Sequence, residues 1–487
     1  RLEQNYRSHG NILTAANALI TNNADRLGKN LWTDAGEGEL IRVFQGVSDL
    51  DEARYIVDEI KELTREGLPR HQMALLYRSN AQSRVLEHAL FQAGIAYRVY
   101  GGLRFFERME VKHALAYLRL IANQDDDTAF LRVVNFPTRG IGARSLEALQ
   151  LEARQLNSSL YNAAASLTGK AGTAVGQFIR MIEGLRTETT GLSLPEVIDH
   201  LLDRSGLRQH YQAEKDGQDR LENLEELVNA AATFADDPEA AHNIDRETGE
   251  ATSLLADFLA HAALEAGEHQ AGDQDEAVQL MTVHSAKGLE FSAVFIVGLE
   301  QGLFPHENAM MARDGLEEER RLMYVAITRA RQRLYLCHAQ TRMLHGQTRY
   351  CLPSSFLDEL PEALLQRINT VPAWSAGSYS TGWSEAPAVD MTTRVSARAA
   401  GAAESAGGFH VGQNVVHTKF GAGVILAAEG RGEGSGENRR RSAGEEGGGE
   451  EGGQEESVTM RAERWAAPEP ARNGALIDAY TVISVGP

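Results

Sequence analysis

Polar side chains suited to ligand binding gather between Gln279 and Phe291, where an apolar run meets a glycine-containing loop. Thr282, His284 and Glu290 place a hydroxyl, an imidazole and a carboxylate close together along the chain. Folds of the α/β class bind ligands where their strands end, so these residue types indicate a binding site. Taken alone, His284 also fits a hydrogen-bonded core or loop histidine, and Glu290 fits a solvated acid.

Arginines crowd a second segment, Glu317 to Leu336, whose start is acidic. Acidic residues at a helix start and basic residues toward its end match the helix macrodipole, which is the simplest explanation of this composition. That explanation does not cover Arg329, which follows an apolar stripe containing Val325 and Ala326. An arginine held by a packed helix can contact a nucleotide γ-phosphate, and such a finger contributes about 10³–10⁵ in turnover.

Two shorter segments carry groups suited to nucleotides or phosphates. Tyr6 presents an aromatic ring, and Arg7 has a planar fork of N–H donors that matches phosphate oxygens. Gly140 and Gly142 precede a helical pattern, so the backbone N–H groups at its start are free to hold a phosphate. Each signal is weak alone, and a glycine turn before a helix is the alternative for the second segment.

The phosphate-binding loop of many ATPases has no counterpart here, because neither GxxxxGKS nor GxxxxGKT occurs in the sequence. The Gly-Lys pairs at Gly28 and Gly169 lack the earlier glycine and the hydroxyl residue. Asp275 and Glu276 do not end an apolar strand, as magnesium-binding acids of such enzymes do, and we interpret them as part of an acidic linker. The sequence therefore shows no evident cradle for ATP phosphates or Mg²⁺.

Composition limits the class of protein. The chain has 487 residues, of which 43% are hydrophobic and 24% charged, as expected for a soluble protein of several domains. Cys337 and Cys351 are its two cysteines, which excludes a disulfide framework or a cysteine-based zinc site and favours a reducing compartment. No apolar run approaches the roughly 18 residues of a membrane span. The formal net charge of −20 excludes a uniformly basic surface but allows a local positive groove.

Hydrophobic periodicity predicts the elements that position these residues. Residues 1–100 alternate between helical and strand patterns, residues 101–273 are mostly helical, and the alternation resumes over 274–372. We predict an α/β domain with a parallel sheet, interrupted by a helical insertion, with two separate α/β domains as the alternative. The predicted helices cover residues 11–20, 48–66, 80–93, 111–121, 143–156, 174–185, 194–202, 220–234, 252–266 and 316–329. The predicted strands cover residues 41–45, 73–77, 95–100, 279–283, 293–298 and 333–338.

The C-terminal residues change in composition. Residues 373–408 are rich in serine, alanine, glycine and threonine and are typical of a linker. Residues 409–428 alternate as a small β-module would, whereas residues 429–456 are dominated by glycine and glutamate and cannot build a core. We expect 409–487 to be an incomplete module with a disordered stretch.

Several motifs, in this order, resemble those of the UvrD/PcrA/Rep helicases, superfamily 1 motors that unwind DNA from 3′ to 5′ with ATP. RLEQNYRS is similar to motif IV, LMTVHSAKGLEF to motif V and EEERRLMYVAITRAR to motif VI. VYGGLRFFERMEVKHALAYLRL and TRGIGARSLE resemble the entry and the duplex-contacting element of their helical insertion. FHVGQNVVHTKFGAGVI resembles their Tudor-like C-terminal module.

The resemblance implies a role for each nucleotide-site residue. Tyr6 is expected to stack on adenine, and Glu290 is expected to hold the ribose. Arg7 and Arg329 are expected to contact the γ-phosphate across a cleft between two motor domains. ATP with Mg²⁺ is the implied cofactor, bound mainly by an N-terminal motor domain that this sequence lacks.

The DNA contacts implied by the resemblance fall on other residues. Thr282 and His284 are expected to contact single-stranded DNA, whereas Thr138, Gly140 and Gly142 are expected to contact the duplex backbone. The implied partners are therefore single-stranded DNA and junctions between single- and double-stranded DNA. Repair proteins or RNA polymerase are implied partners of the C-terminal module, and the implied location is the bacterial cytoplasm, at the nucleoid.

The implied organisation is a RecA-like second motor domain over 1–100 and 274–372, a helical insertion over 101–273, a linker over 373–408 and a Tudor-like remnant over 409–487. The motif set implies that the chain is the C-terminal portion of an ATP-dependent 3′–5′ DNA helicase, and we expect it to be inactive alone because the phosphate loop and the Mg²⁺-binding acids are missing. The chain also begins at Arg1 without a methionine, as a protein entered midway would. The alternatives are a noncatalytic DNA- or partner-binding fragment and a truncated gene or assembly artefact. A fused nuclease is disfavoured because no carboxylate cluster lies in a strand pattern after residue 372.

Overall fold

A computed structural model describes residues 3–24, 28, 30–215, 217–236, 253–267, 276–344 and 346–369, together with four short strands after residue 413. The chain divides into two compact units, Arg1–Ala376 and Gly377–Pro487. The first unit carries every residue that the sequence assigns to a nucleotide or DNA site.

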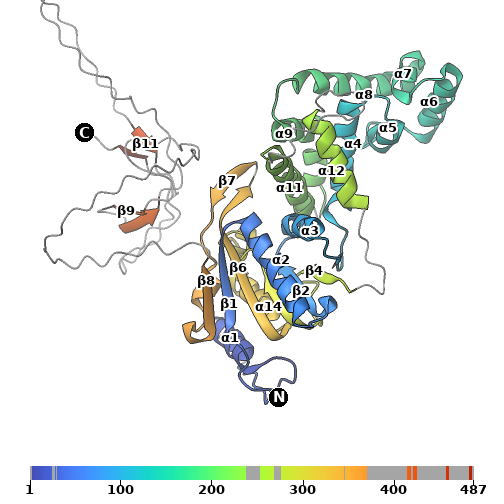
Figure 1. The fold of residues 1–487 in the computed structure, drawn as a ribbon. Helices are drawn as coiled ribbons and strands as arrows, with labels where there is room; N and C mark the ends of the chain where they lie inside the picture. The colour runs from blue at the N-terminus through green and yellow to red at the C-terminus, as the bar shows by residue number, and fades with distance from the viewer. Residues whose placement is uncertain are drawn as a thin grey trace, which may run out of the picture. The chain divides into compact units, whose positions relative to one another are not determined.

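An eight-stranded sheet organises the first unit (Figure 1). Its order is β3-β4-β2-β5-β6-β1-β8, these neighbours all pair in parallel, and β7 adds an antiparallel hairpin to β6. β4 lies between β3 and β2, so strands from both ends of the unit build one sheet. The strands are β1 (Ile41–Ser48), β2 (Met73–Tyr77), β3 (Tyr97–Val99), β4 (Val278–Thr282), β5 (Phe291–Ile296), β6 (Ala330–Leu344), β7 (Gln347–Tyr350) and β8 (Leu365–Asn369). The predicted α/β class is confirmed.

Helices cover both faces of this sheet. Ile12 of α1 (Gly10–Thr21) and Met323 of α14 (Gly315–Ile327) belong to the core on one face. Ile56 of α2 (Asp49–Arg65) and Leu86 of α3 (Ser83–Gln92) belong to the core on the other. Ser48 caps α2, because its Oγ accepts a hydrogen bond from the backbone N–H of Asp51 at 3.2 Å. The short helices of this part are α13 (Glu307–Met310) and α15 (Ser355–Asp358), with 3₁₀ turns at Arg70–Gln72, Asn80–Gln82 and Glu362–Leu364.

The residues between β3 and β4 form a helical part with its own core. Tyr117, Phe130 and Phe178 are fully buried there, and the ring of Phe178 contacts the rings of the other two. Its helices are α4 (Met109–Ala122), α5 (Asp127–Val133), α6 (Ala143–Leu156), α7 (Leu160–Ala163), α8 (Gly169–Glu188), α9 (Leu194–Arg204), α10 (Leu207–Gln212), α11 (Gly217–Ala235) and α12 (Leu254–Gly267), with 3₁₀ turns at Phe105–Glu107 and Ala164–Ser166.

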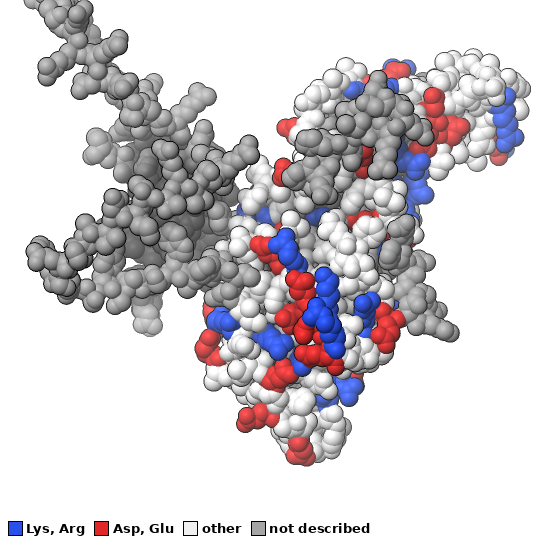
Figure 2. All heavy atoms as spheres, viewed as in Figure 1, with Lys and Arg blue, Asp and Glu red and all other residues white. Residues whose placement is uncertain are grey.

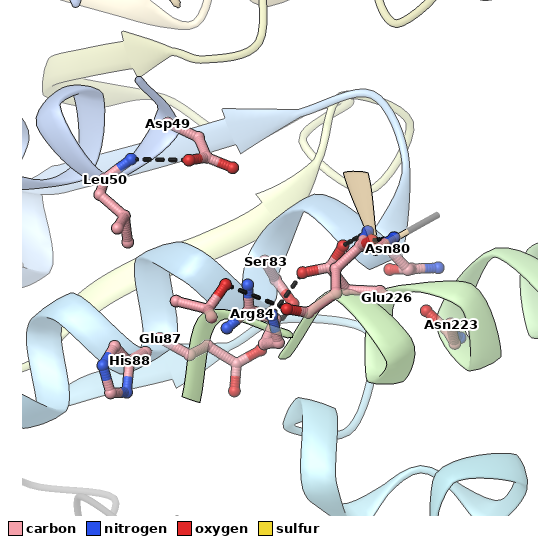
Figure 3. Close-up of polar contacts among 12 residues, drawn as sticks. Asp49, Leu50, Asn80, Ser83, Arg84, Glu87, His88, Asn223 and Glu226 are labelled. Carbon is pink, nitrogen blue, oxygen red and sulfur yellow. Dashed lines mark hydrogen bonds and ion pairs between the residues drawn. The ribbon is translucent and has the colours of Figure 1, made fainter. Parts of the chain in front are cut away.

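A buried polar network joins α3 to the helical part (Figure 3). Arg108 donates hydrogen bonds to Ser83 Oγ at 2.6 Å and to Asn223 Oδ1 at 2.7 Å. It also lies 3.6 Å from the Glu87 carboxylate. Burial raises the pKa of Glu87, and the nearby Arg108 opposes this rise. A buried charge that loses its partner is strongly destabilising. The network therefore favours the arrangement in which α3 packs against the helical part.

The predicted elements differ from the structure mainly at their ends and at short segments. The helix predicted over 316–329 ends at Ile327, so Arg329 lies beyond the helix rather than within it. The strand predicted over 333–338 extends over Ala330–Leu344, because it forms a hairpin with β7. The hairpin strand β7, the edge strand β8 and the short helices α5, α7 and α10 were not predicted, since each is too short to show a clear period.

The second unit is described only at four strands. β9 (Asn414–His417) pairs antiparallel with β10 (Gly421–Val424), and β11 (Ser457–Thr459) pairs antiparallel with β12 (Val482–Ser484). The predicted linker at 373–408 and most of the module predicted over 409–487 lie outside the described residues.

Charges on the visible face of the first unit are mixed rather than gathered by sign (Figure 2). On α2, for example, Arg54 pairs with Asp51 at 2.8 Å and Lys61 lies 3.5 Å from Asp58. Because this face has no excess of positive charge, binding of an anionic ligand there must depend on local groups.

Within the described part of the chain, no helix has the length and apolar character needed to span a membrane.

Candidate functional site

The N-terminal segment lies against the start of β6. The backbone N–H of His9 donates to the carbonyl of Arg331 at 3.0 Å, and Ser8 Oγ donates to the carbonyl of Ala330 at 2.6 Å. The N–H of Phe291 donates to the carbonyl of Arg329 at 3.0 Å, so β5 begins beside β6. Three segments far apart in the sequence therefore meet at the amino edge of the sheet.

Arg7, Glu290 and Arg329 meet at this edge. Arg7 Nε donates to the Glu290 carboxylate, and Arg331 lies 3.9 Å from the same group. Arg329 is only 9% exposed and donates to the carbonyls of Val325 and Leu289, both at 3.0 Å. Its Nη2 also donates to Thr328 Oγ1 at 3.1 Å. These three bonds fix the guanidinium and use three of its five N–H groups.

The cluster carries more positive than negative charge. Arg7, Arg329 and Arg331 surround the single carboxylate of Glu290. Burial lowers the pKa of Arg329, the charge of Arg7 lowers it further, and Glu290 opposes the shift. A bound anion would relieve this repulsion, so the group fits phosphate oxygens. It does not fit Mg²⁺, because the Glu290 carboxylate already pairs with Arg7.

Tyr6 provides a flat surface beside the arginines. It is 84% exposed, and its hydroxyl donates to Gln4 Oε1 at 2.7 Å. Asn5 Oδ1 accepts hydrogen bonds from the backbone N–H groups of Arg7 and Ser8 at 2.7 and 2.9 Å, which fixes the turn that carries both side chains. An exposed ring on a fixed turn is suited to stacking on a planar base.

Thr282 and His284 lie at the opposite, carboxyl edge of the sheet. β4 ends at Thr282 and the parallel strand β5 begins at Phe291, so the link between them returns across the sheet. The link includes a turn at residues 283–288, in which the backbone N–H of Ala286 donates to the carbonyl of Thr282 at 3.1 Å. The segment from Gln279 to Phe291 therefore places side chains at both edges of the sheet and does not form a single site.

A cavity of about 380 Å³ lies beside Thr282 and His284. Burial lowers the pKa of His284, and the charge of Arg78 adds to this effect, so the ring favours its neutral form. Acidic side chains of α11 offset the basic groups, which makes the cavity polar rather than positive. Its lining is Arg78, Ser79, Asn80, Gln218, Asp219, Glu222, Thr282, His284 and His306.

Arg78 was not predicted from the sequence. It follows the buried strand β2, next to β4 in the sheet, and forms hydrogen bonds to both carboxylate oxygens of Glu319 at 2.8–3.0 Å. Glu319 in turn accepts a bond from the backbone N–H of His306 at 3.0 Å. The sequence did offer a signal for Arg78, because it is a charged residue directly after a buried strand. Parallel strands end at the same edge of a sheet, so a residue after β2 is expected close to the residues after β4.

Thr138, Gly140 and Gly142 are exposed on a braced loop. Asn135 Oδ1 accepts bonds from the N–H groups of Arg139 and Ile141 at 2.9 and 3.0 Å. Gly140 has a φ of +75°, a conformation that favours glycine. Gly142 precedes α6, whose first N–H groups have no acceptor within the helix. In Figure 1, α6 lies at the end of the helical part away from the sheet, apart from both sites at the sheet edges.

Arg139 holds this loop on the helical core. Its guanidinium donates to the carbonyls of Val133, Pro137 and Ser205 at 2.9–3.1 Å. It also lies 5.4 Å from the ring centre of Phe178. These contacts of Arg139 therefore hold the exposed backbone of Thr138, Gly140 and Gly142 in one conformation.

The parallel sheet with helices on both faces is the fold expected of a helicase C-terminal domain, and comparison with known families supports this class. Residues 1–341 match the model of the UvrD-like helicase C-terminal domain. The chain belongs to this family.

Curated relatives of this chain are longer proteins. The chain is 48% identical to DNA helicase II of Escherichia coli, over 89% of this chain and 58% of that protein. It is 39% identical to the ATP-dependent DNA helicase PcrA of Bacillus subtilis, over 89% of this chain and 59% of that protein. The chain thus spans less than two thirds of these relatives and matches their C-terminal portion. A solved C-terminal domain of a possible DNA helicase from Lactobacillus plantarum is 12% identical, covers 74% of this chain and 98% of its own, and has a TM-score of 0.28, too low to bear on the fold.

Proposed function

We propose that this chain is the C-terminal portion of an ATP-dependent 3′–5′ DNA helicase, in which it supplies one wall of the ATP site and part of the DNA path. The observation that carries this proposal is the cluster of Arg7 and Arg329 around Glu290, beside the exposed ring of Tyr6. In the proposed arrangement, residues 1–100 and 274–372 form the second motor domain and residues 101–273 its helical insertion.

The cluster suits the charge that develops during phosphoryl transfer. Negative charge spreads over the oxygens of the transferred group, and fixed N–H donors stabilise it without further reorganisation. Arg329 is held by its bonds to Leu289 and Val325, and Arg7 is held by Glu290, so both can serve as such donors. Tyr6 then stacks on adenine and Glu290 contacts the ribose. Mg²⁺, which neutralises phosphate charge when bound, is assigned to carboxylates outside this cluster.

The DNA contacts are assigned to two separate surfaces. Thr282 and His284 contact single-stranded DNA through hydrogen bonds, since the neutral ring favoured at His284 adds little charge. The braced loop with Thr138, Gly140 and Gly142 contacts the duplex backbone at a junction. Cytoplasmic location at the nucleoid, and repair proteins or RNA polymerase as partners of residues 409–487, belong to the same proposal.

The test joins this chain to the part of the Escherichia coli relative that it does not match, and compares Arg329→Ala with Arg333→Ala. Arg333 lies four residues further along the chain, in β6, but pairs with Glu39 at 3.0 Å and with Glu66, so it is a matched control. We expect R329A to lower DNA-stimulated ATP turnover by about 10³-fold or more, with single-stranded DNA binding largely kept. R333A should keep turnover near that of the parent protein. Unchanged turnover in R329A would refute the assignment.

The same protein distinguishes the alternative of a noncatalytic DNA-binding chain. A DNA binder that contacts phosphates loses affinity as salt rises, because counterions are released on binding. Salt-sensitive DNA binding without any ATP turnover in the joined protein would favour that alternative. Turnover that DNA stimulates would exclude it.

A further inference from the structure

Two histidines and a glutamate converge where α3 meets α12. His88 Nδ1 lies 2.5 Å from Glu265 Oε1, and His261 Nε2 lies 2.9 Å from the same oxygen. The three ligand atoms all lie within 4.8 Å of one another. We propose that His88, His261 and Glu265 form a binding site for one divalent transition-metal ion of the zinc type, which ties the helical part to the sheet part.

The positions of the three residues match the requirements of such a site. His261 and Glu265 are four residues apart on α12 and so project from one helix face, while His88 comes from α3. Zinc accepts imidazole nitrogen and carboxylate oxygen at about 2.0–2.1 Å in tetrahedral geometry, which separates the ligand atoms by about 3.3 Å. The nitrogens would have to move away from Oε1 by only about 0.4–0.8 Å to admit the ion.

The surroundings hold the ligands in place and leave a route for the ion. Glu265 is 7% exposed, and Arg104 donates to its carbonyl at 3.4 Å, which fixes the end of α12. The ring of His261 lies 5.3 Å from that of Phe234 and 5.4 Å from that of His88. His88 also lines a cavity of about 770 Å³, so solvent reaches the site and can supply the fourth ligand.

The chemistry of the three side chains fits a transition-metal ion. Two neutral imidazoles and one carboxylate form a set of nitrogen and oxygen ligands that zinc, cobalt and nickel accept. This ion would be distinct from any Mg²⁺ that accompanies ATP, because Mg²⁺ prefers oxygen ligands.

The experiment measures zinc binding to the 487-residue chain by calorimetry and cobalt binding by visible absorption. His88→Asn and His261→Gln are the informative variants, because each side-chain amide keeps an N–H near the position of the lost ring nitrogen but is a poor metal ligand. His200→Ala is the matched control, since His200 pairs with Glu188 at 2.8 Å without a second histidine. Circular dichroism establishes that each variant is folded.

We expect one zinc ion per chain, a tetrahedral cobalt spectrum and a higher thermal midpoint with zinc for the parent chain and H200A. H88N and H261Q should weaken zinc binding by more than about 100-fold, since even loss of an outer partner of a metal ligand weakens binding by about 10–100-fold. Both should also lose the zinc-dependent rise in midpoint. The proposal is overturned if zinc does not bind stoichiometrically, or if H88N and H261Q bind it as tightly as the parent. ATP turnover plays no part in this test, so its outcome is independent of the helicase assignment.

Discussion

Replacing Arg342 with methionine should destabilise the sheet part in a pH-dependent way. Arg342 lies on β6 and serves two buried carboxylates, Glu300 and Glu52, which are 0% and 2% exposed. Its Nη2 donates to Glu300 Oε1 at 2.8 Å. Methionine fills a similar volume but carries no charge, so the two carboxylates would face each other with only backbone partners. The N–H groups of Ala339 and Gly298 donate to them at 2.7 and 3.0 Å.

Removing one partner of a buried ion pair lowers the free energy of unfolding by about 3–5 kcal/mol, and this sets the expected size of the effect. Because one guanidinium serves two carboxylates, R342M should lose about 5 kcal/mol of unfolding free energy near about pH 8. Burial raises the pKa of Glu52, the charge of Arg342 lowers it, and Glu300 raises it again. Removing Arg342 therefore raises the pKa of Glu52 further.

The sign of the pH dependence follows from proton binding. Between the pKa of the unfolded glutamate and the raised pKa in the folded variant, the folded state binds more protons, so stability rises as the pH falls. Each pH unit in this range changes the unfolding free energy by about 1.4 kcal/mol. The penalty of R342M should therefore be smaller near about pH 5 than near about pH 8, by at least about 1.4 kcal/mol.

Urea unfolding followed by circular dichroism at both pH values measures this difference. Arg367→Met is the matched control, because Arg367 pairs with Glu362 at 2.8 Å on the surface, with 43% and 67% of the side chains exposed. It should change stability far less than R342M, since surface pairs contribute little. A penalty for R342M that is small, or equal at both pH values, would refute the reasoning.

Three further predictions concern the helix cap and the DNA contacts. Ser48→Ala should lower the unfolding free energy by about 1 kcal/mol in urea titrations, because α2 loses the bond that the Asp51 N–H donates to its cap. Arg139→Ala should weaken binding to a tailed duplex by about tenfold, about 1.4 kcal/mol in fluorescence anisotropy, and leave single-strand affinity unchanged, because only the braced loop is released. His284→Gln should weaken single-strand binding without changing its salt dependence near neutral pH, because burial and Arg78 lower the pKa of His284 and a neutral ring releases no counterion. A salt slope smaller in magnitude by about 0.7 in H284Q would show that His284 binds as a cation.

Long periodic elements were predictable because their signal is local. In α2, Ile56, Ile60 and Leu63 recur at helical spacing, and the cap at Ser48 marks its start. The strand Met73–Tyr77 is apolar at every position and is buried at every position. Edge strands such as β8 and short helices such as α5 were missed, because a few residues do not establish a period.

The candidate site was only partly predictable. Tyr6, Arg7, Glu290 and Arg329 were selected from their segments, but their meeting point depends on a pair of residues, Arg7 and Glu290, that are 283 positions apart. The placement of Glu290 at the edge opposite His284 followed from the direction of β4 and β5, which no local pattern reveals. Arg78 could have been found, because it directly follows a buried strand.

The sequence by itself determined the α/β alternation, the helical stretch between its two halves, and the side chains able to bind phosphate. These properties depend on neighbouring residues, and neighbours impose a period of about 3.6 or 2 on the chain. The tertiary structure decided which residues far apart in the sequence form ion pairs or can bind one ligand together. His88 and Glu265 are 177 positions apart and meet only because α12 packs beside α3. Such pairs depend on strand order and helix packing, which are set by burial summed over the whole unit rather than by any one segment.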